Sequence, residues 1–398
     1  MWSIMGALVL GAVLAAAAYW ELHRYIKTST VLAAPIDLTK LSLTVVAGVG
    51  GVVALVVAYR RQRDLEQGRF VERFGAAAAQ LGSTDVAVRI AGAYAMAGVA
   101  DESRGLRRQQ CIDVLCGYLR LPYNAEHGAS GRAKFVVKAP RVDHGRVRGE
   151  TEEHIEYRQN DSEVRKTIVS IIADHLRPTA EYSWSPSNFT FRGAYLEDVD
   201  FSHATFSGTV AFSGVTFSGF TTFTGATFSG DALFDDVTFS GNSAFERVTF
   251  SGFTTFTGAT FSHTARFFDT IFSADAWFSH ATFSDIAFFL DATFSGLTSF
   301  NGATFSGAVV FRGATFSRTT RFSHATFSDN ALFNDATFSG HIVFEEVDFG
   351  TQSVSFADPR RWGPPEPEFD WSADITLKPA NVEPHDWPPA VVTPVPSS

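Results

Sequence analysis

Two uninterrupted apolar runs stand near the N-terminus. Residues 2–20 and residues 41–59 each contain 19 residues and no charged side chain, and a helix needs about 20 apolar residues to cross a bilayer. Alanine and glycine recur every four residues in both runs, a spacing that allows close helix packing. A cleaved signal peptide is the alternative for the first run, but no lysine or arginine precedes it. The pattern predicts a hairpin of two transmembrane helices in the lipid bilayer.

Lysine and arginine are distributed unequally around these runs. Three of them lie in residues 21–40, whereas five arginines lie in residues 60–73. Because positive residues near a span stay on the cytoplasmic side, we expect a multi-pass protein of the cell membrane with both termini in the cytoplasm. The spacing of Cys111 and Cys116 fits neither a redox pair nor a zinc site. Both lie in an apolar helical pattern, so we expect buried, reduced thiols.

The residues that follow show the periodicity of helices. Apolar residues recur at three- and four-residue steps through residues 61–123, which predicts a cytoplasmic module of three short helices. Residues 124–160 are mostly polar and charged, and they predict a linker. Residues 161–185 contain one more amphipathic helix, closed by Pro178, which we expect to cap the domain that follows.

Phenylalanine dominates the next part of the chain. The sequence has 39 Phe against 9 Tyr and 7 Trp. From Phe201 to Phe349, a Phe recurs at alternating steps of five and six residues, and all 28 positions of this series are Phe, in 14 units of eleven residues. In the commonest form of the unit, Phe-x-x-Ala-Thr-Phe-Ser-Gly is followed by three variable residues, as in residues 300–310.

The spacing of the Phe residues decides the secondary structure. In an α-helix, five residues turn through about 500°, so successive Phe would point in different directions. In a straight strand, a step of five would place every second Phe on the opposite face. The two Phe residues of a unit both point inward only if the backbone turns a corner after each short extended side. Ala303 and Phe305 would then face the interior and Thr304 the solvent, with Gly302 and Gly307 near corners where positive φ is allowed.

This pattern resembles the pentapeptide-repeat family, whose unit is alanine, aspartate or asparagine, leucine or phenylalanine, and two variable residues. Residues 194–208 step by five as Ala-Tyr-Leu-Glu-Asp, Val-Asp-Phe-Ser-His and Ala-Thr-Phe-Ser-Gly. The resemblance covers residues 189–350 and implies a right-handed, four-sided β-helix with roughly four pentapeptides per coil. Two departures stand out: threonine replaces the usual aspartate or asparagine, and every second unit has six residues, which gives 22 per coil. A wider coil suits an all-Phe interior.

The predicted fold class is therefore a multi-domain α+β protein, with an N-terminal transmembrane hairpin, a small helical module and a C-terminal β-helix (solenoid). The predicted boundaries are 1–60 for the membrane helices, 61–123 for the helical module, 124–160 for the linker, 161–185 for the capping helix and 186–350 for the β-helix. Nine prolines lie in residues 363–398, and residues 351–398 are predicted to be a disordered tail.

No catalytic motif interrupts these patterns. The sequence has no Gly-rich phosphate loop, no nucleophile elbow and no paired histidines on a helix. We therefore expect a protein that is not an enzyme, with no catalytic, cofactor-binding or metal-binding residues and no cofactor. Several histidines and aspartates lie at loose repeat positions, but their spacing fits neither zinc nor calcium sites; they are His203, His263, His280, His324, Asp231, Asp235, Asp275, Asp285, Asp291 and Asp335.

Charge and surface leave two hypotheses for function. The net charge of −10 argues against nucleic acid as a partner, because such a surface must be basic. The first hypothesis is a membrane-anchored, non-catalytic scaffold that binds an unknown protein through the flat sides of the β-helix, with residues 2–20 and 41–59 in the bilayer. The second follows from the resemblance, since some family members imitate B-DNA and bind a topoisomerase such as gyrase. The sequence leaves the oligomeric state and the binding face open.

Overall fold

A computed structural model of the chain describes residues 16–17, 20–21, 24, 35–125, 134–143, 146–156 and 160–392. It divides into one unit of Met1–Gly75 and another of Ala76–Ser398. The described residues of the first unit belong mainly to α2 (Pro35–Leu81), which continues into the second. This helix runs through the predicted boundary at residue 60, because the arginine- and glutamate-rich residues that follow are good helix formers.

The described residues give no support to the predicted transmembrane hairpin. Among the described residues, no helix combines the length and apolar character that crossing a bilayer requires. The first apolar run, residues 2–20, lies almost entirely outside the described residues. The location of the termini stays a prediction from the sequence.

After the end of α2, the second unit continues with two helices in the segment predicted as the helical module and a third in the segment predicted as the capping helix. They are α3 (Val86–Glu102), α4 (Leu106–Leu119) and α6 (Asp161–Leu176). Asp85 caps α3, and its carboxylate accepts a hydrogen bond of 2.7 Å from the backbone N–H of Ala87. Gly92 allows α3 to pack against the end of α2, because a Cβ there would lie 2.5 Å from the backbone nitrogen of Leu81.

The two cysteines lie on α4, and both are buried and free. Burial raises the pKa of the Cys111 thiol to about 11 and that of Cys116 to about 12. Such thiols are protonated at neutral pH and pack as small apolar groups, as the sequence predicts.

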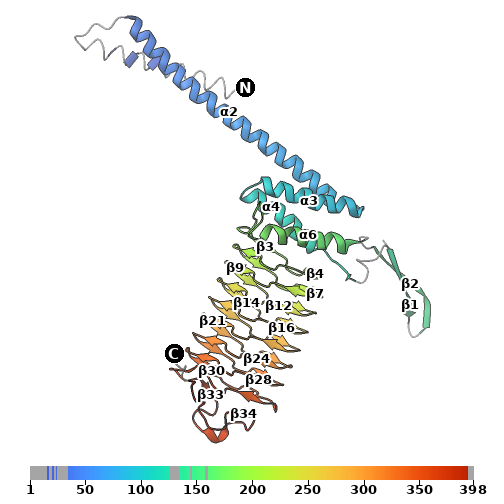
Figure 1. Ribbon diagram of the computed structural model, residues 1–398. Helices are drawn as coiled ribbons and strands as arrows, with labels where there is room; N and C mark the ends of the chain where they lie inside the picture. Colours follow the sequence, from blue (N-terminus) through green and yellow to red (C-terminus); the bar gives the residue numbers. More distant parts are fainter. Residues whose placement is uncertain are drawn as a thin grey trace. The chain divides into compact units, whose positions relative to one another are not determined.

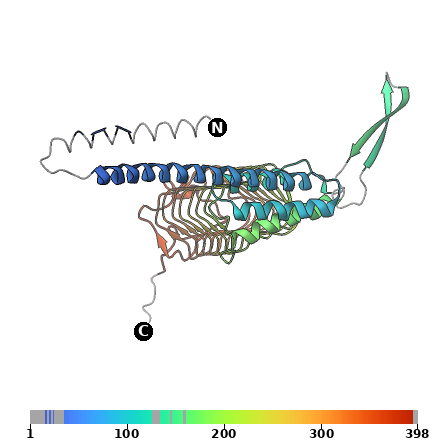
Figure 2. The same ribbon diagram turned by 90° about the horizontal axis from the view of Figure 1, so that it is seen from above.

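The segment predicted as a linker contains an antiparallel hairpin, formed by β1 (Lys134–Asp143) and β2 (Arg146–Glu156). Figure 2 shows its two long strands. The register pairs Lys134 with Glu156 and Lys138 with Glu152. Hydrophobic alternation does not reveal this hairpin, because much of the segment is charged.

The rest of the described chain forms a solenoid of four parallel sheets, with the strands of neighbouring coils stacked on one another (Figure 1). Sheet I consists of β3 (Phe189–Thr190), β6 (Val210–Ala211), β10 (Ala232–Leu233), β14 (Thr254–Thr255), β18 (Ala276–Trp277), β22 (Thr298–Ser299), β26 (Thr320–Arg321), β30 (Ile342–Phe344) and β33 (Glu368–Phe369). Sheet II consists of β4 (Tyr195–Glu197), β7 (Thr216–Ser218), β11 (Thr238–Phe239), β15 (Thr260–Phe261), β19 (Thr282–Phe283), β23 (Thr304–Phe305) and β27 (Thr326–Phe327).

The other two sheets complete the four sides. Sheet III consists of β8 (Thr221–Thr222), β12 (Ser243–Ala244), β16 (Ala265–Arg266), β20 (Ala287–Phe288), β24 (Val309–Val310), β28 (Ala331–Leu332), β31 (Val354–Ser355) and β34 (Val382–Glu383). Sheet IV consists of β5 (Thr205–Phe206), β9 (Thr227–Phe228), β13 (Thr249–Phe250), β17 (Ile271–Phe272), β21 (Thr293–Phe294), β25 (Thr315–Phe316), β29 (Thr337–Phe338) and β32 (Arg361–Trp362). Thr238 pairs with Thr216 in one neighbouring coil and with Thr260 in the other, which confirms the 22-residue coil.

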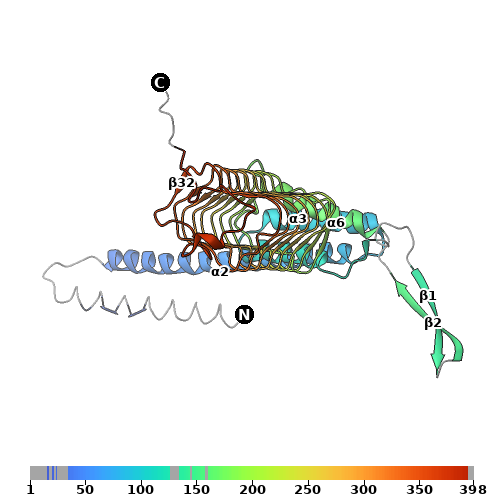
Figure 3. The same cartoon turned by 90° about the horizontal axis from the view of Figure 1, so that it is seen from below.

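Four columns of aromatic rings fill the interior, one behind each sheet. Along a column the rings stack, as Phe239 and Phe283 do on either side of Phe261, with centroids 4.8 and 4.7 Å apart. Across the interior the rings meet edge to face, and Phe256 and Phe267 lie 5.7 Å apart at 88°. Both geometries are favoured by the ring quadrupole. The view along the stack in Figure 3 shows successive coils with nearly the same outline.

Most corners after the first Phe of a unit are hydrogen-bonded turns. The N–H of Ala303 donates to the carbonyl of Phe300 over 3.0 Å, and Gly302 between them has φ of +64°. His280, one coil earlier, has φ of +56° at the equivalent position. A positive φ at the third residue is typical of type II turns. Gly307 differs from the expectation: its φ is not positive, and a Cβ there would lie 2.6 Å from the Asp285 carbonyl carbon, so a larger residue would require the backbone to shift.

The predicted disordered tail instead extends the solenoid. Its aromatic residues continue the four columns: Phe338 to Trp362 at 5.3 Å, Phe344 to Phe369 at 4.7 Å, Phe349 to Trp371 at 5.4 Å and Phe356 to Trp387 at 5.9 Å. A short 3₁₀ helix, η1 (Ile375–Leu377), lies between β33 and β34. The prediction of disorder is wrong through residue 392, because the high proline content and the irregular spacing of these aromatic residues hide the continuation of the solenoid.

The other end of the solenoid is closed by α4 and α6. Gln109 on α4 bonds both backbone groups of Asn188: its Oε1 accepts from the N–H at 2.9 Å, and its Nε2 donates to the carbonyl at 2.7 Å. Arg120 donates to the carbonyl of Thr190 at 2.8 Å. These side chains satisfy a strand edge that would otherwise be open to other chains.

A buried ionic cluster holds the helices together. Asp161 on α6 accepts hydrogen bonds from Arg89 at 3.0 Å and from the hydroxyl of Tyr118 at 2.5 Å. Arg165 lies 4.0 Å from the second oxygen of the same carboxylate. Arg165 also donates to the carbonyls of Leu119 and, over 3.0 Å, Tyr195 in the first coil. The cluster therefore links three helices to the solenoid.

Candidate interaction surface

The outward side chains differ among the four sheets. Sheet II presents threonine in six successive strands, β7 to β27, and sheet IV presents threonine in every strand from β5 to β29 except β17, where Ile271 takes the place. Each threonine is half-buried between its neighbours in the coils above and below. These two faces are uniform arrays of hydroxyl groups, and they single out no position as a site.

Sheet I carries a compact apolar group, which we call the sheet I patch: Phe253, Trp277 and Leu297. Trp277 is 45% exposed and Leu297 is 47% exposed. The rings of Phe253 and Trp277 meet edge to face with centroids 5.1 Å apart. The three residues lie on or directly before the strands β14, β18 and β22 of consecutive coils.

Two aspartates fix the backbone beneath this patch. The carboxylate of Asp231 accepts a hydrogen bond from the N–H of Phe253 at 3.2 Å, and that of Asp275 accepts one from the N–H of Leu297 at 2.9 Å. Each bond joins neighbouring coils at the residue before a strand. The aspartates therefore hold the apolar side chains in place, and they put negative charge at the edge of the patch.

Sheet III carries a larger apolar group, which we call the sheet III strip. Phe288, Val310 and Leu332 occupy the same outward position in three consecutive strands. The ring of Phe268 lies 5.1 Å from that of Phe288. The strip consists of Phe268, Ile286, Phe288, Leu290, Val310 and Leu332, of which Ile286 is 37% exposed and the others are half-buried.

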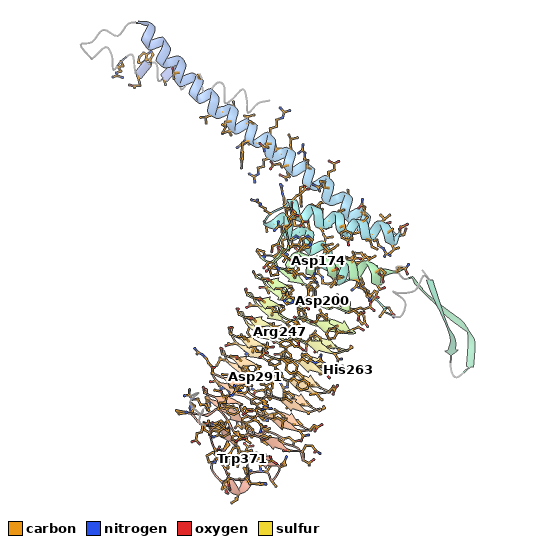
Figure 4. All side chains as sticks on the ribbon, viewed as in Figure 1. Asp174, Asp200, Arg247, His263, Asp291 and Trp371 are labelled. Carbon is orange, nitrogen blue, oxygen red and sulfur yellow. The ribbon has the colours of Figure 1, made fainter. Side chains whose placement is uncertain are left out.

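Charged residues of the solenoid lie at corners such as those of Arg247 and Asp291, where φ is positive; Figure 4 labels both residues, together with His263. Several are paired between coils: Arg312 with Asp335 at 2.8 Å, His324 with Glu346 at 3.1 Å and Arg360 with Asp291 at 3.8 Å. Exposed pairs of this kind add little stability. In the described chain, no three His, Cys, Asp or Glu residues are grouped as a metal site would require.

Two further residues weighed as metal ligands, Asp235 and Asp285, accept hydrogen bonds from threonine hydroxyls. Asp235 accepts from the Thr255 hydroxyl at 2.6 Å, and Asp285 accepts from the Thr264 hydroxyl at 3.2 Å. Each contact joins two coils.

The repeat sequence of the solenoid matches a known protein family. A family described as "Pentapeptide repeats (9 copies)" matches residues 191–238 and 278–326. With the four-sheet solenoid and its inward Phe columns, this match shows that the repeat domain belongs to the pentapeptide-repeat family. Comparison with curated proteins and with solved structures gives no match. The topoisomerase hypothesis gains no support from these findings.

Neither the sheet I patch nor the sheet III strip was predicted from the sequence. The sequence does carry a signal, because Phe253, Trp277 and Phe288 stand at outward positions that the preceding coil fills with a polar residue in each case. Without the coil geometry, however, nothing indicates that they gather on two sheets.

Proposed function

We propose that the solenoid is a non-catalytic scaffold that binds a partner protein through the sheet I patch. The exposed ring of Trp277, which meets the ring of Phe253 edge to face, is the observation that carries the proposal. Tryptophan is enriched among the residues that dominate binding energy at protein interfaces. The rest of the outward face of sheet I is mainly small or polar, which gives the patch the apolar centre and polar rim of an interface.

The supporting structure favours binding without rearrangement. The residues beneath the patch are Phe rings at 0% exposure, such as Phe256 and Phe278, and the aspartate bonds fix the chain on both sides. A preformed surface loses little conformational entropy when a partner binds. Because Asp231 and Asp275 lie beside the patch, we expect a partner with an apolar anchor flanked by basic residues.

The Trp277→Ser variant tests this function in the full chain. We expect at least one protein that co-purifies with the native chain to be recovered about 30-fold less well, the effect of losing a hot spot of about 2 kcal/mol. Thr282→Ser, in the same coil on sheet II, is the matched control and should leave recovery unchanged. Equal recovery of every co-purifying protein with both variants, measured by quantitative mass spectrometry, would refute the proposal.

A further inference from the structure

We propose that the sheet III strip is the interface of a homodimer, in which two copies of the chain pack face to face. This inference is independent of the sheet I patch, which lies on another sheet of the solenoid. The strip is a continuous apolar surface of six side chains, centred on the ladder of Phe288, Val310 and Leu332. Monomeric soluble proteins rarely expose a large continuous apolar patch that has no binding role.

The order of residues along the strip favours a second copy as the occupant. Arg266 precedes Phe288 on the outward ladder, and Ser355 and Glu383 follow Leu332 in the last two strands. A two-fold axis in the plane of the interface can align the two solenoids parallel or antiparallel. In the parallel arrangement, Arg266 would face Arg266 of the other copy. The antiparallel arrangement instead moves each Arg266 toward the end that carries Glu383, so opposite charges approach.

The spacing of the coils also fits a second copy. Strands in neighbouring coils lie about 4.8 Å apart, so two copies present ridges with the same period. The eight strands of sheet III span about 34 Å, and a side of about five residues is about 17 Å wide, so the flat area is about 570 Å². Two such faces would bury about 1,100 Å² in total, which is above the roughly 1,000 Å² that a specific interface should clear. The strip would form its apolar centre, with the charged residues Arg266 and Glu383 toward its two ends.

The double substitution Phe288→Arg and Val310→Arg tests the dimer. Arg266 already occupies the equivalent outward position of sheet III, and Arg321 that of sheet I, so we expect the variant to fold. In sedimentation equilibrium of the full chain in mild detergent, the native chain should be a dimer. The variant should be a monomer, with a dissociation constant at least 100-fold higher.

The matched control places arginine at Leu233 and Trp277 on sheet I, and it should remain dimeric. If the arginine variant of sheet III loses its circular dichroism spectrum, Phe288→Thr and Val310→Thr replace it, since threonine is the usual outward residue of the repeat. A native chain that is monomeric at about 50 µM, far above the Kd range of specific complexes, would overturn the inference. So would a folded sheet III variant that stays dimeric.

Discussion

Replacing Phe267 with alanine is expected to lower the free energy of unfolding by about 3–5 kcal/mol, the usual cost of removing a buried aromatic side chain. The ring is fully buried and stacks on Phe245 and Phe289, each 4.8 Å away. It also meets Phe256 and Phe278 edge to face at 5.7 Å. The surrounding rings are held by their own coils, so the cavity cannot collapse. Urea unfolding of the full chain, followed by circular dichroism, measures the loss.

Two controls separate the cavity from general damage to the repeat. Thr282→Ala removes an outward side chain of a neighbouring coil and should change stability by less than about 0.5 kcal/mol. Phe267→Leu keeps part of the volume and should fall between the alanine variant and the native chain. A Phe267→Ala variant as stable as the Thr282→Ala variant would contradict the account of a core made of ring columns.

Replacing Asp161 with alanine is the second large effect that we expect, again about 3–5 kcal/mol, because it removes the carboxylate that faces the buried side chains of Arg89 and Arg165. The side chain of Arg89 is 0% exposed and that of Arg165 is 4% exposed. Burial also lowers the pKa of Arg165, which shows how costly its charge is at this position. Differential scanning calorimetry of the full chain measures the loss as a fall in Tm.

The double variant Arg89→Met and Asp161→Ala provides the control. It removes one buried charge together with its partner, and Arg165 keeps its two carbonyl acceptors. We expect this variant to be more stable than Asp161→Ala alone. Equal stability would mean that the cluster contributes through packing and not through charge.

The fold of the repeat was largely predictable from the sequence, because the step of five and six residues admits only a coil that turns at each corner. The positions of Ala303, Phe305 and Thr304 follow from that coil, and the structure confirms them. The structural role of Gly307 could not be predicted from the repeat pattern. It depends on how closely the backbone of one coil approaches the next, and no local pattern encodes that distance.

The ends of the solenoid and its binding surface were predicted less well. Trp362, Trp371 and Trp387 are separated by prolines, so they lack the period that identifies the other coils, although each completes a column. The two apolar groups on sheets I and III arise from residues far apart in the sequence. Only the 22-residue coil brings Phe253 beside Trp277 and Phe268 beside Phe288.

The central claim is that the sheet I patch and the sheet III strip bind proteins, whereas the threonine faces of sheets II and IV do not. One coil contains an outward residue of each sheet: Trp277, Thr282, Phe288 and Thr293. A photo-reactive amino acid placed at each position in turn, in the native cell, tests the claim directly. We expect a cross-link to another protein from position 277, a cross-link between two copies from position 288, and little product from positions 282 and 293. Equal labelling from all four positions, or the strongest products from the threonine sheets, would contradict the account.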